Sequence, residues 1–139
     1  MIILDTNVIS EAMSTSPNAN VAQWLTGQPA SLLFTTTITL AEILYGIELL
    51  PDGKRRSALL LAVQSVFPKL FAGRVLSFDE AAARAFAPIA ARRRSSGRPI
   101  TLFDAQIAAT AKANDATLAT RNTGDFEDCG VRLINPWVD

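Results

Sequence analysis

Short apolar runs alternate with helix-patterned segments along the whole chain, and this alternation restricts the fold more than any other feature. Each run is apolar or β-branched and is followed by polar or turn residues, which is typical of a strand. The strands predicted on this basis cover residues 2–4, 32–37, 74–78, 117–120 and 131–134. Strands that alternate with helices form a parallel sheet with helices on both faces. The sequence therefore predicts an α/β fold.

The segments between the strands carry helix signals. Helices are expected where apolar residues recur at helical spacing, over residues 21–25, 40–50, 59–71 and 102–114. Asp79 is well placed to cap a further, Ala-rich helix, because an Asp side chain accepts hydrogen bonds from the first backbone N–H groups. Pro88 falls inside that helix and predicts a kink or a break there.

Composition limits both the number of domains and the available chemistry. The chain has 139 residues, of which 49% are hydrophobic, so we expect a single domain over residues 1–139. It has no histidine and only one cysteine, Cys129. Histidine metal ligands, Ser-His triads and an intrachain disulfide are therefore excluded. Thirteen basic and thirteen acidic residues give no net charge, so contact with nucleic acid would need a local basic patch.

The sequence also gives an expected location. The amino terminus lacks the basic segment and cleavage site of a signal peptide. Glu42 and Glu48 interrupt the longest apolar region, so no membrane-spanning segment is expected. We therefore expect a cytoplasmic protein that does not contact a membrane.

Two of the acids are expected at the carboxyl ends of strands. Asp5-Thr6-Asn7 follows the first strand directly, and Asp125 follows the fourth within a predicted loop. In a parallel α/β sheet, ligands bind beyond the carboxyl ends of the strands. The alternative for Asp5 is a structural one, since Asp and Asn also suit turns and helix starts.

Two further acids lie near predicted helix starts. Glu42 closes the sequence Thr39-Leu40-Ala41-Glu42, and Asp104 closes Thr101-Leu102-Phe103-Asp104. Both sequences fit a capping box or its Asp variant, so capping is the structural alternative for each acid. Both acids are expected in the first helical turn, where the helix dipole stabilises an anion.

Asp5, Glu42, Asp104 and Asp125 can therefore converge at one edge of the sheet. Four carboxylates without histidine match the oxygen ligands that Mg²⁺ or Mn²⁺ prefers. Without a metal ion they would repel one another, and the pKa of at least one should rise. The cluster is thus best interpreted as a metal site.

The ordered set of motifs resembles the PIN-domain ribonucleases, and within them the VapC-type toxins of the FitB subgroup. The segments that carry this resemblance are Leu4-Asp5-Thr6-Asn7, Thr39-Leu40-Ala41-Glu42, Phe103-Asp104-Ala105-Gln106-Ile107-Ala108, residues 120–126 and the closing Asn135-Pro136-Trp137. It covers essentially the whole chain. It implies a Rossmann-like PIN domain, a Mg²⁺ or Mn²⁺ cofactor and cleavage of RNA. It further implies a homodimer and a cognate antitoxin that covers the active site. DNA would be contacted only through this antitoxin.

The resemblance also implies roles for individual residues. Asp5, Glu42 and Asp104 match the three principal acids of the family, and Asp125 is taken as the fourth, although some relatives carry an acid at the place of Asn122. Asp5 and Asp104 would hold the cation, with Glu42 and Asp125 completing its shell through waters. Thr6, Asn7, Thr120 and Asn122 would orient ligands and waters.

Two basic clusters have two interpretations each. Arg92, Arg93, Arg94 and Arg98 suit an RNA-phosphate patch, but they also suit the carboxyl end of a helix, whose dipole favours cations. The same choice holds for residues 54–56. Both interpretations stay open from the sequence.

Two rival functions remain. The first is a phosphatase with an aspartyl nucleophile, which the opening motif disfavours because Asn7, two residues after Asp5, is not a second acid. The second is a catalytically weak PIN-domain regulator that acts mainly in a DNA-binding complex with its antitoxin, and the amide at Asn122 keeps this alternative open.

Overall fold

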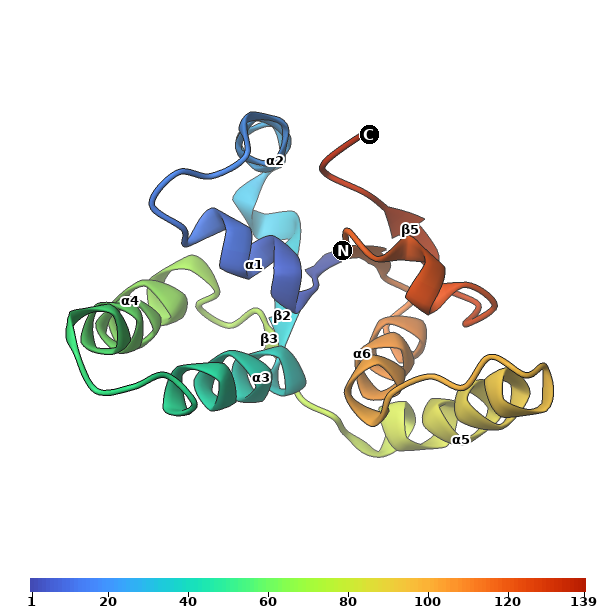
Figure 1. Ribbon diagram of the computed structural model, residues 1–139. Helices are drawn as coiled ribbons and strands as arrows, with labels where there is room; N and C mark the ends of the chain where they lie inside the picture. Colours follow the sequence, from blue (N-terminus) through green and yellow to red (C-terminus); the bar gives the residue numbers. More distant parts are fainter.

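A computed structural model describes all 139 residues and has a parallel sheet of five strands at its centre (Figure 1). The strands are β1 (Ile2–Leu4), β2 (Leu33–Thr36), β3 (Val75–Leu76), β4 (Thr117–Ala119) and β5 (Arg132–Ile134). Their order across the sheet is β3-β2-β1-β4-β5, and all neighbouring pairs are parallel. The predicted parallel α/β fold is confirmed.

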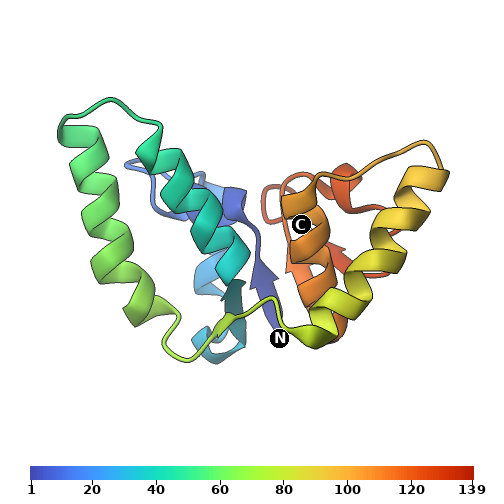
Figure 2. The same cartoon turned by 90° about the horizontal axis from the view of Figure 1, so that it is seen from below.

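Six helices and two short 3₁₀ helices connect the strands. They are α1 (Thr6–Ala12), α2 (Ala19–Thr26), η1 (Ala30–Leu32), α3 (Thr37–Glu48), α4 (Lys54–Leu70), α5 (Glu80–Ser95), α6 (Leu102–Ala113) and η2 (Thr123–Phe126). Figure 2 shows the pair α3 and α4 on one side of the molecule and the pair α5 and α6 on the other, with β1 between them. None of these helices combines the length and the apolar character needed to cross a membrane.

Successive residues of the central strand β1 belong to two different hydrophobic cores. Ile3 is fully buried in the core beneath α5 and α6, whereas Leu4 belongs to the core formed with α1, α2, α3 and α4. This is the period of two that places successive strand side chains on opposite faces. Ile3 also aligns with Phe34 of β2 and Leu118 of β4. The sheet is therefore covered on both faces, as predicted.

Two local predictions have clear outcomes, and one helix was not predicted. Asp79 caps α5, because its carboxylate accepts a 2.9 Å hydrogen bond from the N–H of Ala82. Of the kink or break predicted at Pro88, the break is wrong, since α5 runs without interruption through this residue. Helix α1 had no counterpart in the sequence analysis beyond the suggestion that Asp5 begins a turn or a helix.

Candidate active site

Asp5 lies at the carboxyl end of the central strand, and its carboxylate is held by three donors. It is the N-cap of α1 and is only 4% exposed. Its Oδ1 accepts a 2.8 Å hydrogen bond from the N–H of Thr6. Its Oδ2 accepts hydrogen bonds from the Thr120 hydroxyl, at 2.8 Å, and from Asn7 Nδ2, at 3.1 Å. The cap suggested by the sequence is present, and the same carboxylate also faces the sheet edge.

Thr120 connects this carboxylate to the loop after β4. Its hydroxyl accepts hydrogen bonds from Asn7 Nδ2, at 3.3 Å, and from the N–H of Asn122, at 3.1 Å, while it donates to Asp5. The Asn7 side chain in turn accepts a 3.1 Å hydrogen bond from the N–H of Arg121. The N-terminal end of α1 and the loop after β4 are thus joined in one polar network.

Glu42 reaches the same network from α3. Its Oε1 accepts a 2.8 Å hydrogen bond from the Thr6 hydroxyl. The structural alternative, a capping box that starts at Thr39, is not formed, and the predicted place of Glu42 in the first turn is wrong: Thr36 is the N-cap, and its hydroxyl accepts from the N–H of Thr39. The helix starts at Thr37, so Glu42 stands in the second turn, and the first turn contains no acid. Glu42 therefore does not cap α3, and its contact with Thr6 directs it towards Asp5.

Asp104 lies in the first turn of α6, as predicted. Thr101 is the N-cap of this helix, and its hydroxyl accepts a 3.2 Å hydrogen bond from the N–H of Asp104. The Asp104 side chain is partly buried, whereas the preceding Leu102 and Phe103 are exposed. The cap fixes the backbone and leaves the carboxylate facing the other acids.

The two candidates for the fourth position both lie in the loop after β4. Asn122 is exposed and precedes η2 directly, and its backbone N–H binds Thr120. Asp125 is an exposed residue of η2, whose backbone N–H donates to the carbonyl of Asn122. Of these two residues, only Asp125 carries a charge.

Burial and mutual repulsion raise the pKa of three of the four acids. For Asp5, burial raises the pKa most, hydrogen bonds from Thr120, Thr6 and Asn7 oppose this, and the charge of Asp125 adds to the rise. For Glu42, burial raises the pKa, the Thr6 hydroxyl lowers it, and the charges of Asp5 and Asp104 raise it further.

Asp104 follows the same rule. Burial raises its pKa most, and the charge of Asp5 raises it next. The Thr101 hydrogen bond lowers it, Asp125 raises it, and the cation of Arg93 lowers it. Asp5, Glu42 and Asp104 thus each experience the charge of other acids that are distant in the sequence, which indicates that the folded chain brings these acids near one another.

The acids suit a hard divalent cation, because their ligand atoms are carboxylate oxygens and the chain has no histidine. No group of three acidic side chains is, however, close enough to hold one ion directly. Mg²⁺ commonly binds one or two carboxylates and keeps several waters. The arrangement therefore fits an ion that contacts one or two of these carboxylates and reaches the others through water.

The arginine cluster divides into different roles. Arg93 is 4% exposed and is a buried structural residue, which the sequence analysis did not distinguish from its neighbours. Its spacing of four from the buried Ile89 was the available signal, because such residues share one helix face. Arg98 pairs with Glu127 at 3.0 Å and Asp128 at 3.7 Å, while Arg92 and Arg94 are exposed. In the second cluster, Arg56 pairs with Glu48.

Comparison with known families agrees with this geometry. The family model described as "PIN domain" matches residues 2–130. The chain belongs to the PIN-domain family. The resemblance inferred from the motifs is thereby confirmed, together with the fold that it implied.

Curated relatives of this PIN domain match it over nearly its full length. Plasmid stability protein StbB of Pseudomonas syringae pv. tomato is 47% identical and covers 99% of each chain. Toxin FitB of Neisseria gonorrhoeae is 42% identical and covers 100% of each. VapC ribonuclease Y4jK of Sinorhizobium fredii is 42% identical and covers 99% of this chain and 98% of the relative.

Solved structures give the same grouping. The crystal structure of FitAcB from Neisseria gonorrhoeae contains a chain of 41% identity that superposes with a TM-score of 0.92 and covers 100% of both chains. A structure of FitAB bound to an IR36 DNA fragment contains a chain of 42% identity with a TM-score of 0.91, covering 99% of this chain and 96% of that one. This PIN domain is therefore similar to the FitB and VapC proteins.

Proposed function

We propose that this chain, acting as one PIN domain over residues 1–139, is the toxin of a type II toxin–antitoxin pair and hydrolyses RNA phosphodiester bonds with a divalent metal ion. The observation that supports the proposal is the hydrogen bond to Glu42 from Thr6, the neighbour of Asp5, together with the pKa values of Asp5, Glu42 and Asp104, which burial and nearby acids raise. We take Asp125 as the fourth acid. Relatives named toxin FitB and VapC ribonuclease support it. Because the substrate is RNA, we expect the protein to act in the cytoplasm.

The contacts of these residues suggest a different role for each of them. Asp5 and Asp104 would hold Mg²⁺ or Mn²⁺, and Glu42 and Asp125 would act on it through waters. A bound divalent ion neutralises charge on the phosphate and makes water a better nucleophile. Thr120 and Asn7 fix the Asp5 carboxylate by hydrogen bonds, and Thr6 does the same for Glu42. Such partners of metal ligands commonly hold the ligands in the productive orientation.

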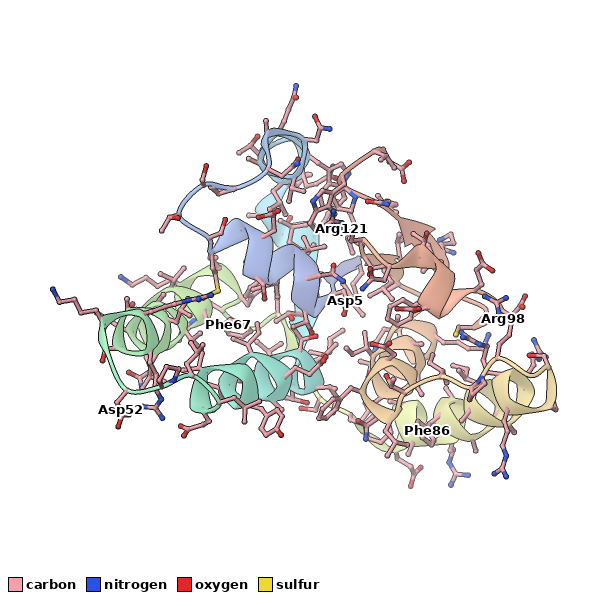
Figure 3. The ribbon with its side chains drawn as sticks, in the orientation of Figure 1. Asp5, Asp52, Phe67, Phe86, Arg98 and Arg121 are labelled. Carbon is pink, nitrogen blue, oxygen red and sulfur yellow. The ribbon has the colours of Figure 1, made fainter.

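The test is RNA cleavage by the purified protein, with single-stranded and structured RNA, in Mg²⁺, in Mn²⁺ and in a chelator. We expect cleavage only with the metal ions, and a loss of at least about 100-fold in Asp104→Asn, because even partners of ligands cost up to that amount. Asp52→Asn is the matched control, because Asp52 is fully exposed between α3 and α4 and lies far from Asp5 in Figure 3. Equal activity of Asp104→Asn and wild type would contradict the proposal.

The antitoxin partner is supported by an apolar groove on the α1, α2 and α4 side. Twelve of its thirteen lining residues are hydrophobic, its volume is about 430 Å³, and Val66 and Leu70 of α4 line it while remaining 41% and 54% exposed. Exposed apolar surface of this kind marks protein–protein contact sites. We propose that an apolar segment of the antitoxin occupies this groove, and that DNA is bound only by the complex.

A homodimer is a separate proposal, supported by a second set of exposed apolar side chains. Tyr45 and Leu49 of α3 are 60% and 67% exposed, and Leu102 and Phe103 at the start of α6 are 71% and 43% exposed. Helices α3 and α6 pack against each other. Light scattering of wild type and of a Leu49→Lys, Leu102→Lys variant tests the proposal, and a wild type that is monomeric at all concentrations would contradict it.

The second candidate function is a catalytically weak regulator, favoured by the amide at Asn122 and by the DNA present in the FitAB structure. It predicts no cleavage of any RNA under any metal condition, and DNA binding only when the antitoxin is present. The cleavage assay and a DNA mobility-shift assay separate the two functions.

A further inference from the structure

Arg93 is a buried cation without a carboxylate partner. It is 4% exposed, although it stands between the exposed Arg92 and Arg94, and it forms no salt bridge within 4.0 Å. Burying an unpaired charge is costly unless its donors are all satisfied. The guanidinium therefore depends on hydrogen bonds to neutral acceptors, and their location indicates what it holds.

Most of these acceptors lie on one short segment after β4. Arg93 Nη1 donates to the carbonyls of Asp125, at 2.7 Å, and Glu127, at 3.0 Å, and lies 3.7 Å from Cys129 Sγ. Its Nε donates to the carbonyl of Arg98 at 2.7 Å. A single planar group thus fixes residues 125–129 to the carboxyl end of α5, and Figure 3 shows the neighbouring Arg98 beside this segment.

The segment 125–129 has little regular secondary structure. It contains only the end of η2, a four-residue 3₁₀ helix, and no strand. Asp128 has a positive φ of 62°, a conformation that costs energy for a residue with a side chain. Short 3₁₀ segments are weak on their own. The backbone conformation here is therefore maintained by the guanidinium of Arg93, by the salt bridges of Arg98 to Glu127 and Asp128, and by the buried Phe126 and Cys129. Of these side chains, Arg93 is the one that binds the backbone carbonyl of Asp125.

The Arg93 contact leaves the functional group of Asp125 free. Arg93 binds the backbone carbonyl of Asp125, and the Asp125 carboxylate forms no hydrogen bond or salt bridge within the chain. The same carboxylate acts electrostatically on Asp5 and Asp104. A fixed backbone with a free carboxylate is what a water-mediated ligand of the proposed metal site requires.

We propose that Arg93 is a positioning residue: its buried guanidinium holds residues 125–129 so that the Asp125 carboxylate faces Asp5 and Asp104. This inference rests on the proposed metal-dependent ribonuclease for its activity readout, but its structural part stands on the contacts of Arg93 alone.

The test is a double-mutant cycle between Arg93→Met and Asp125→Asn, with Arg84→Met as the matched control because Arg84 is an exposed arginine of the same helix. We expect each single change to lower RNA cleavage and Mn²⁺ affinity about 10- to 100-fold, the usual cost of removing a partner of a metal ligand. In the Asp125→Asn background, Arg93→Met should cost less than about twofold, because residues that act as one unit are not additive. Arg84→Met should match wild type.

Two more measurements test the role of Arg93. Hydrogen exchange of the amides of residues 125–129 should accelerate in Arg93→Met and not in Arg84→Met. Arg93→Lys, which keeps the charge but not the fork of donors, should lie between Arg93→Met and wild type, and it replaces Arg93→Met if that variant does not fold.

Additive losses in the double variant would overturn the proposal, as would unchanged exchange of residues 125–129 or unchanged Mn²⁺ affinity in Arg93→Met. A wild type that binds Mn²⁺ but cleaves no RNA would refute the proposed ribonuclease, and the affinity and exchange measurements would still decide the role of Arg93.

Discussion

The two sides of the sheet differ in how completely they are filled. On the α5 and α6 side, small residues pack closely, with Ala108, Ala109 and Ala111 fully buried around Ile107, and a buried arginine joins η2 to this side. On the other side, Val66 and Leu70 remain partly exposed beside a groove of about 430 Å³. The core beneath α5 and α6 is closed by the chain itself, whereas the other side retains an apolar groove.

The candidate site stands where the two sides meet. Ile3 faces the closed side and Leu4 the open side, and Asp5 follows them at the end of the same strand. Glu42 comes from α3 on the open side, while Asp104 and Asp125 come from α6 and η2 on the closed side. A partner bound on the open side would therefore lie close to elements that carry part of the site.

The largest expected difference between the sides is in stability. Ile107→Ala should lower the free energy of unfolding by about 2–5 kcal/mol, because it leaves a cavity in a closed core. Leu70→Ala on the open side should change the free energy of unfolding by no more than about 0.5 kcal/mol, since the side chain is half-exposed. Urea unfolding measures both values. Similar losses for the two variants would remove the distinction between a closed and an open side.

The network at the junction is expected to matter for activity more than for folding. Thr120→Val removes the hydroxyl that binds Asp5, and it should lower RNA cleavage about 10- to 100-fold. Thr35→Val is the matched control: Thr35 is equally buried in the sheet, but its hydroxyl has no hydrogen-bond partner. Steady-state cleavage rates should separate the two variants, and a Thr35→Val variant as impaired as Thr120→Val would contradict this account.

The open side should be sensitive to charge only in the complex. Val66→Glu places a carboxylate in the groove and should weaken binding of the cognate antitoxin at least about tenfold, the effect of losing a contact worth more than 1 kcal/mol. Leu61→Glu changes a 65% exposed residue of α4 outside the groove and should leave affinity unchanged. Titration calorimetry with both variants checks this. Equal affinity of Val66→Glu and wild type would place the antitoxin elsewhere.

The smallest expected effect is a pH dependence of stability at the junction. The pKa values of Asp5, Glu42 and Asp104 are raised above their ordinary values of 3.8 and 4.5, so the folded protein binds more protons than the unfolded chain above those values. The metal-free protein should therefore lose stability as pH rises from those values through the raised ones. We expect a fall of a few degrees in Tm, and a smaller one in Glu42→Gln, Asp104→Asn. A Tm that rises with pH in both proteins through this window would contradict the shifts.

Local signals predicted part of the site, and contacts distant in the sequence determined the rest. Asp5 after Ile2–Leu4 and the Thr101 cap before Asp104 were predicted because strand ends and caps depend on a few neighbouring residues. The prediction that Glu42 lies in the first turn of its helix was wrong. Thr36 and Thr39 are both suitable N-cap residues, and the end of β2 at Thr36 decides between them.

Other features depended on packing that local patterns do not report. Helix α5 continues through Pro88, since the buried Ala82, Ile89 and Arg93 anchor it on both sides of the proline. This packing outweighs a local cost of about 3 kcal/mol. The helical spacing of Arg93 from Ile89 indicated a shared face, but two of its acceptors, the carbonyls of Asp125 and Glu127, lie more than thirty residues away and could not be read from that spacing.

The central claim is that acids from both sides of the sheet hold one divalent ion. Crystals of the wild-type protein grown with Mn²⁺ and measured at an anomalous wavelength test it most directly. The account predicts one anomalous peak in contact with the Asp5 and Asp104 carboxylates, with Glu42 and Asp125 joined to it through waters, and no such peak in Asp104→Asn. A peak elsewhere, or no peak at saturating Mn²⁺, would contradict the account.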